Sequence, residues 1–273
     1  YYSRPSIKWI RIVFSLLFAC MITLANYKLW SIESVHGVLV LVAVFFGSCF
    51  AFNNILLWIF ENINTVVWTE KKVSNPLRIF FITFGVIVCI NLLVLFLCTY
   101  PGNLTTDSID QMNQLISNDY SNHHPFYHTL IIKVFISLGF RLFHDINAAV
   151  AFYSVFSILF MAASFSFAIA TVAELHAPKW IITLLQLFFT LMPYHILYSM
   201  TMWKDIFFGA AVLLYVVFFF RCMKQMTLNV FNYVGLIISA FGVCLLRSNG
   251  YFAFIFTALC FLLLWKLRKK RIV

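Results

Sequence analysis

Eight apolar runs, each close to membrane-spanning length, constrain the fold of this sequence more than any other feature. They cover residues 12–25, 38–60, 79–98, 148–172, 180–197, 206–220, 230–246 and 251–265. A helix needs about 20 apolar residues to cross a bilayer, and the shorter runs reach this length with their flanking residues. Because the two-residue alternation of barrel strands is missing, helices are the expected spanning form. The pattern predicts an all-α, polytopic integral membrane protein with about eight transmembrane helices.

The composition supports this class and excludes an ordinary soluble domain. The 273 residues are 63% hydrophobic and 10% charged, against about 45–50% and about 25% in soluble domains. The net charge of +10 could suit nucleic acid, but most basic residues flank apolar runs, so no nucleic acid is expected. The seven cysteines lie mostly inside apolar runs and form no CxxC pair, so they are expected to be small core residues. A chain that starts at Tyr1 and stops after a basic run is expected to be part of a longer protein.

A polar segment at residues 100–128 interrupts the apolar pattern. It holds three of the nine acidic residues and three of the seven histidines: Asp107, Asp110, Asp119, His123, His124 and His128. Pro101-Gly102 is expected to end the preceding helix. A new helix is then capped by Thr106, Asp107 or Ser108.

The helix that begins at this cap is predicted to lie along the membrane interface. Ser108 and Gln111 have the spacing of a capping box. The apolar face is formed by Ile109, Met112, Leu115 and Ile116, and the polar face by Asp107, Asp110, Gln111 and Gln114. Asp107 lies at the amino end, where free N–H groups and the helix dipole favour an ionised carboxylate. A lone acid there would be only a cap, but the nearby histidines and Asp110 favour a general base or a metal site.

Residues 126–143 form a further candidate helix. Although the segment is long enough to cross, Thr129, Lys133, Ser137 and Arg141 recur every four residues as one polar stripe. This predicts a second helix along the membrane surface. With eight spans, the amino terminus then lies inside and residues 100–128 outside, with fourteen Lys and Arg residues inside and five outside. The short basic inner loops are expected to be topology anchors.

Two further loops share the predicted outer side. Lys204 and Asp205 are adjacent, so on a helix they do not face each other. A solvated helix start, with Asp205 as a first-turn acid, is an equal alternative to a functional role for this pair. Arg247, beside Ser248 and Asn249, lies at the outer end of a span, against the charge rule. A lipid phosphate is a natural partner for this arginine, and snorkelling to headgroups is the alternative.

A resemblance to bacterial polytopic proteins of the GT-C glycosyltransferase superfamily rests on four stretches. They are YPGNLTTDSIDQ (100–111), NHHPFYHT (122–129), MPYHILYSMTMWKD (192–205) and LRSNGYF (246–252). From about residue 79 onwards the chain is similar to the DUF6020 family and, more distantly, to the protein mannosyltransferase and RgtA/B/C/D-like families. Asp107 matches the acidic residue of their first outer loop, and His124-Pro125 matches the element that opens a juxtamembrane helix. Ser108 departs from the usual Asp-Glu pair and Phe126 from the usual second proline, which leaves the base open between Asp107 and Asp110.

The resemblance implies a partial GT-C-like module at residues 77–273, preceded by two extra N-terminal transmembrane helices at residues 1–76. Such enzymes transfer a sugar from a polyprenyl-phosphate donor to a glycan, lipid or protein acceptor at the outer face of the bacterial cytoplasmic membrane. The implied residues are Asp107, Asp110 and His124 for catalysis, Arg247 and Lys204 for the donor phosphate, and His123, Asp205 and Asn249 in support. A divalent metal held by Asp107, Asp110 or His124 is an open alternative.

Other function classes stay open beside a glycosyltransferase. A transporter or lipid flippase would use ionisable residues near the bilayer midplane, and the apolar runs contain almost none. A non-catalytic membrane assembly partner is a third interpretation for a chain that resembles only the front half of the known enzymes.

Overall fold

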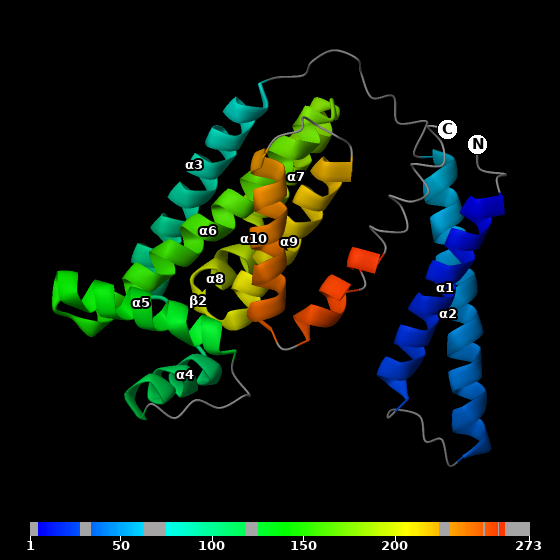
Figure 1. The fold of residues 1–273 in the computed structure, drawn as a ribbon, viewed down its shortest axis with the longest axis horizontal. Coiled ribbons are helices and arrows are strands. Elements are labelled where there is room, and N and C mark those ends of the chain that lie inside the picture. Colours follow the sequence, from blue (N-terminus) through cyan, green and yellow to red (C-terminus); the bar gives the residue numbers. More distant parts are fainter. Residues whose placement is uncertain are drawn as a thin grey trace. The chain divides into compact units, whose positions relative to one another are not determined.

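The computed structural model describes residues 5–27, 34–62, 75–117, 125–223, 230–247, 249–255 and 257–259. The chain divides into two units, Tyr1–Trp68 and Thr69–Val273. Most described residues of both units are helical (Figure 1), which confirms the predicted all-α class.

The first unit is a pair of helices, α1 (Pro5–Asn26) and α2 (Val35–Asn62). Ser15 and Ala19 of α1 are buried, and the rings of Phe18 and Phe52 stack with their centres 4.0 Å apart. Small side chains allow such close helix packing in membranes. Most large apolar side chains of the pair are exposed, and both helices are long and apolar enough to cross a membrane.

The second unit contains the remaining elements. In chain order they are α3 (Pro76–Val94), its π-helical extension η1 (Leu95–Thr99), β1 (Asn103–Leu104), α4 (Thr106–Ser117), α5 (Phe126–Phe143), α6 (Ile146–Glu174), α7 (Lys179–Leu191), α8 (Pro193–Ser199), β2 (Thr201–Met202), α9 (Lys204–Met223), α10 (Val230–Leu245) and a short helix at Gly250–Leu259. Local signals set some of these bounds. The Asn75 side chain accepts from Leu77 N–H at the start of α3, and the Asp145 side chain accepts from Ala148 N–H at the start of α6.

Helix α6 forms the centre of the second unit. It packs against α3, α5, α7 and α9 and buries mainly alanine and serine side chains. These small residues let neighbouring backbones approach closely. The backbone of α5 comes close to α6, because a Cβ on Gly139 would lie 2.8 Å from Ala149 Cα.

Six helices within the described ranges are long and apolar enough to cross a membrane: α1, α2, α3 with η1, α5, α6 and α9. The bent pair α7–α8 would make a seventh span. All eight predicted apolar runs contain a described helix, but α10 has only 16 residues and the helix at Gly250–Leu259 is also short. The chain is therefore a multi-pass membrane protein by the length and composition of its helices.

The predicted run at residues 180–197 is broken, contrary to expectation. Helix α7 ends at Leu191 and α8 begins at Pro193, with a bend of 53° between them. Proline has no N–H to continue the helical hydrogen bonds, and its ring drives the preceding residue out of the helical conformation. Met192 accordingly has an extended backbone, with φ −64° and ψ 115°.

Helix α5 crosses α6 instead of running alongside it. His128, near the start of α5, reaches Tyr153, and Phe143, at its end, contacts Phe152. These two partners are neighbours on α6, so the whole length of α5 lies against a short part of that helix. Figure 1 shows α5 lying across one end of the other helices. Helix α5 has the length and composition to cross a membrane, so its place along the membrane surface stays a prediction.

The two ends of the second unit gather different segments. The α4 end, which is the lower one in Figure 1, holds α4, α8, β2 and the start of α9. The α7 end holds the start of α7, the ends of α6 and α9 and the start of α10. Within the second unit, the described segments that were predicted to lie outside thus share one end, and the described helix termini next to predicted inner loops share the other.

Candidate functional site

A short parallel β-ladder joins the polar segment to the chain before α9. β1 pairs with β2 so that Asn103 lies opposite Thr201, and Asn103 N–H donates to Met200 O at 3.0 Å. Gly102 has φ +125°, which side chains rarely adopt, and a Cβ there would collide with Ser154 Oγ. The helical pattern did not predict this ladder. It brings two sequence-distant polar segments together at the α4 end.

The cap of α4 differs from the predicted one. Thr105 is the N-cap residue: Ser108 N–H donates to Thr105 Oγ1 at 3.2 Å, and Thr105 N–H donates to Ser108 Oγ at 2.6 Å. This reciprocal pair satisfies two free donors, with Ser108 in the place where a capping box usually has Glu or Gln. The predicted Ser108–Gln111 box is therefore wrong. Asp107 lies in the first turn of α4, as predicted.

Asp107 meets a basic residue from a distant segment. Lys204 Nζ, at the start of α9, lies 3.0 Å from Asp107 Oδ2. The lysine side chain is 14% exposed and the aspartate side chain 32%. Because water reaches the ammonium poorly, this pair is screened less than one on an open surface. The contact connects α4 to α9.

A second ion pair involves Asp205, the residue after Lys204. Arg247 Nη1 lies 3.3 Å from Asp205 Oδ1, a buried atom that has no hydrogen-bond partner in the described part of the chain. The guanidinium of Arg247 also lies over the Phe208 ring, 5.6 Å from its centre. Lys204 and Asp205 face different partners, as expected for adjacent helical residues. The start of α9 thus contacts both α4 and the chain after α10.

Gln111 is fully buried, whereas the sequence placed it on an outer polar face. Its Oε1 lies 2.9 Å from His128 Nδ1, and its Nε2 donates to Thr129 Oγ1 at 2.9 Å. His128 Nε2 lies 3.0 Å from Tyr153 Oη. All four side chains are completely buried. They form a hydrogen-bonded group, the buried polar chain, that joins α4, α5 and α6.

Sequence reasoning did not identify the buried polar chain. The predicted stripe on α5 included Thr129, which is buried, while Lys133, Ser137 and Arg141 are exposed. His128 carried a signal because it belongs to the histidine-rich polar segment. Tyr153 lies within an apolar run, where no pattern distinguished it from a packing residue.

The other predicted site residues have different surroundings. Asp110 is exposed on α4, and Asn249 is exposed in the turn where Gly250 N–H donates to Arg247 O at 2.9 Å. His123 and His124 lie outside the described residues. Among the residues that are described, no group of three or more His, Cys, Asp or Glu side chains could hold a metal ion.

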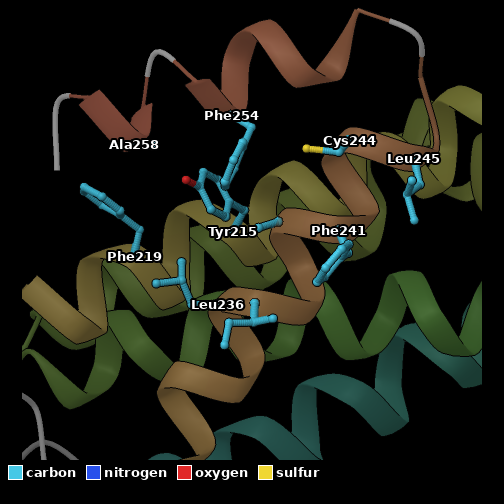
Figure 2. A pocket seen from close by; sticks show the side chains of 10 residues that line it. Tyr215, Phe219, Leu236, Phe241, Cys244, Leu245, Phe254 and Ala258 are labelled. Atoms are coloured by element: carbon cyan, nitrogen blue, oxygen red, sulfur yellow. The ribbon is translucent and has the colours of Figure 1, made fainter. Parts of the chain in front are cut away.

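An apolar groove of about 560 Å³ runs along α10. Figure 2 shows its walls, which come from α9, α10 and the helix at Gly250–Leu259 and include Tyr215, Phe219 and Phe254. The hydroxyl of Tyr215 lies 3.0 Å from Thr257 Oγ1. On α10 the lining extends to Leu245, two residues before Arg247. The groove therefore has a cation close to the end of one of its walls.

Comparisons with known proteins give one match. The family DUF6020, a family of unknown function, matches residues 115–273. The matched region contains Lys204, Asp205 and Arg247 and begins after Asp107. No curated protein and no solved structure matches the chain. Since the match extends over more than half of the sequence, the chain belongs to the DUF6020 family.

Proposed function

We propose that this chain forms part of a GT-C-type membrane glycosyltransferase. It transfers a sugar from a polyprenyl-phosphate donor to an acceptor hydroxyl at the outer face of the bacterial cytoplasmic membrane. One observation carries the proposal beyond the sequence resemblance. The two ion pairs at the start of α9 bring the acid and both cations that the reaction needs to one end of the second unit.

The proposed reaction is a direct displacement. The acceptor oxygen attacks the anomeric carbon, and its proton passes to the Asp107 carboxylate. The bond between the anomeric carbon and the phosphate oxygen breaks at the same time. The polyprenyl phosphate leaves with the electron pair, and Lys204 and Arg247 stabilise its charge. A single displacement inverts the configuration of the sugar.

The donor phosphate competes with the carboxylates for the two cations. Arg247 is 47% exposed, and its contact with Asp205 lacks hydrogen-bond alignment, so it is the cation that a phosphate recruits more easily. Lys204 is bound to Asp107 and is less exposed. Contact of the phosphate with Lys204 would release Asp107, whose carboxylate could then accept the proton.

The groove along α10 suits the hydrocarbon part of the donor. Within a bilayer, a lipid chain gains from close packing against helices and not from leaving water. The groove supplies aromatic and aliphatic walls from three helices. A chain that occupies it can place its phosphate near Arg247, because the lining on α10 extends to Leu245.

The test is sugar transfer by the full-length protein with a labelled polyprenyl-phosphate sugar. Asp107→Asn keeps the shape of the side chain but removes the charge, so the helix should persist. We expect the rate to fall about 10²–10⁴-fold, as for removal of a general base.

Asp110→Asn is the matched control, because it removes a second carboxylate from the exposed part of the same helix. It should keep a rate close to that of the wild type. Loss of activity in Asp110→Asn alone would move the base to that residue. Absence of sugar transfer by the wild-type protein would refute the proposed function.

A further inference from the structure

The buried polar chain takes no part in the proposed reaction, yet it lies beside the residue on which that reaction depends. We propose that Gln111, His128 and Tyr153 are positioning residues that fix the rotation of α4 and so direct Asp107 towards Lys204. The importance of Asp107 rests on the proposed function. The positioning itself is a property of the structure and can be tested without sugar transfer.

The hydrogen bonds of the buried polar chain link three helices in series. Gln111 Nε2 donates to Thr129 Oγ1, so Gln111 Oε1 is the acceptor that faces His128 Nδ1. With this orientation of the amide, Nδ1 donates to Gln111 Oε1, and Nε2 lies at hydrogen-bonding distance, 3.0 Å, from Tyr153 Oη. Each of the four buried side chains has a hydrogen-bond partner within the group, and removing one partner leaves a buried polar group at a cost in free energy.

Asp107 lies between two anchors of α4. The first anchor is the reciprocal pair of Thr105 and Ser108, which fixes where the helix begins. The second anchor is Gln111, which is four residues beyond Asp107 and therefore on the same side of the helix. A rotation of α4 that broke the bonds of Gln111 would also move Asp107 away from Lys204.

Apolar packing alone does not fix this rotation as closely. Met112 and Leu115 pack against the core of the second unit, but apolar contacts are not directional. Ile109 and Ile116 are exposed. A helix of 12 residues has little stability of its own. The orientation of α4 therefore depends on the directional bonds of the buried polar chain.

Cross-linking in the membrane measures this orientation. Asp107→Cys and Lys204→Cys are introduced together into the full-length protein and joined with a short bismaleimide. Mass spectrometry of the cross-linked peptide gives the yield and separates it from products of the native cysteines. The double-cysteine protein has no ion pair between positions 107 and 204. Its cross-linking yield therefore reports the placement of α4 without that contact.

Two substitutions each remove one hydroxyl from the buried polar chain with little change of shape. Tyr153→Phe removes the hydroxyl that contacts His128 Nε2, and Thr129→Val removes the acceptor for Gln111. We expect the cross-linking yield to fall severalfold in both backgrounds. Thr129→Ser keeps the hydroxyl and should restore the yield of the parent protein.

A second cysteine pair, Asn103→Cys with Thr201→Cys, is the reference, because these residues lie opposite each other on β1 and β2. A loss confined to the 107–204 pair supports the positioning role. An unchanged yield at that pair overturns it, and so does an equal loss at both pairs, which would indicate general loosening. Since no reaction is measured, either result is independent of whether the protein transfers a sugar.

Discussion

The α7 end and the α4 end of the second unit each hold an arginine beside a carboxylate, but the two arginines are bound differently. At the α7 end, Arg221 of α9 pairs with Glu174 and donates to Thr171 Oγ1 at 3.1 Å and to Asn232 Oδ1 at 3.0 Å. Its guanidinium also lies 5.3 Å from the centre of the Phe167 ring. These contacts join α6, α9 and α10.

Arg247 at the α4 end is more weakly held. Within the described ranges its partners are one carboxylate, at 3.3 Å, and the ring of Phe208. Its side chain is 47% exposed, against 12% for Arg221. A guanidinium has five N–H donors. Arg221 uses its donors to join helices, whereas Arg247 has fewer partners within the described ranges. Under the proposed function, a similar ion pair therefore serves structure at one end and binding at the other.

The largest expected effect is loss of stability in Arg221→Met. The substitution leaves Glu174 without its cation and removes the hydrogen bond that Arg221 donates to the buried Asn232. We expect a loss of about 2–3 kcal/mol in the free energy of unfolding, because broken networks leave unmatched polar groups. Unfolding of the purified protein in detergent measures it. An equal loss in Arg247→Met would remove the distinction between the two ends.

A second test concerns how the α4 end is built. Its polar segments are held by the backbone, through Gly102 and the β-ladder, more than by buried charge. Gly102→Ala should destabilise the protein by about 2 kcal/mol, since it forces a positive φ on a residue with a Cβ and a collision with Ser154.

Gly209→Ala is the control for this substitution. A Cβ at Gly209, within α9, would meet nothing within 4 Å. Replacing a helical glycine by alanine there should be neutral or stabilise by up to about 1 kcal/mol. Equal unfolding curves for Gly102→Ala and the wild type would show that the α4 end does not depend on the backbone of that segment.

The sequence predicted the helical class and the common side of Lys204, Arg247 and Asp107 for simple physical reasons. Apolar length identifies helices that can cross a bilayer. Alternation of successive spans then assigns each loop to a side, whatever the details of packing. The contact between Asp107 and Lys204 follows from this assignment together with a β-ladder that the sequence did not reveal.

The details that sequence reasoning missed depend on packing between distant segments. The sequence pattern placed Gln111 on an outer polar face because it assigns polar residues at helical spacing to the exposed side of a helix. Its burial depends on His128 and Thr129, which supply matching partners from another helix. The proline at position 193 is itself a local signal for the break. The apolar residues on both sides of it nevertheless gave the pattern of one continuous span.

The smallest expected change in stability is that of Arg247→Gln, and this variant tests the comparison most directly. Its ion pair is half exposed and poorly aligned, so the free energy of unfolding should change by no more than about 0.5 kcal/mol. Added polyprenyl phosphate should raise the unfolding temperature of the wild type, because a ligand stabilises the state that binds it. This rise should be lost in Arg247→Gln and kept in Lys133→Gln, which removes an exposed cation from α5. A rise that persists in Arg247→Gln would show that the exposed donors of Arg247 do not bind the lipid phosphate, and the contrast with Arg221 would then be one of exposure alone.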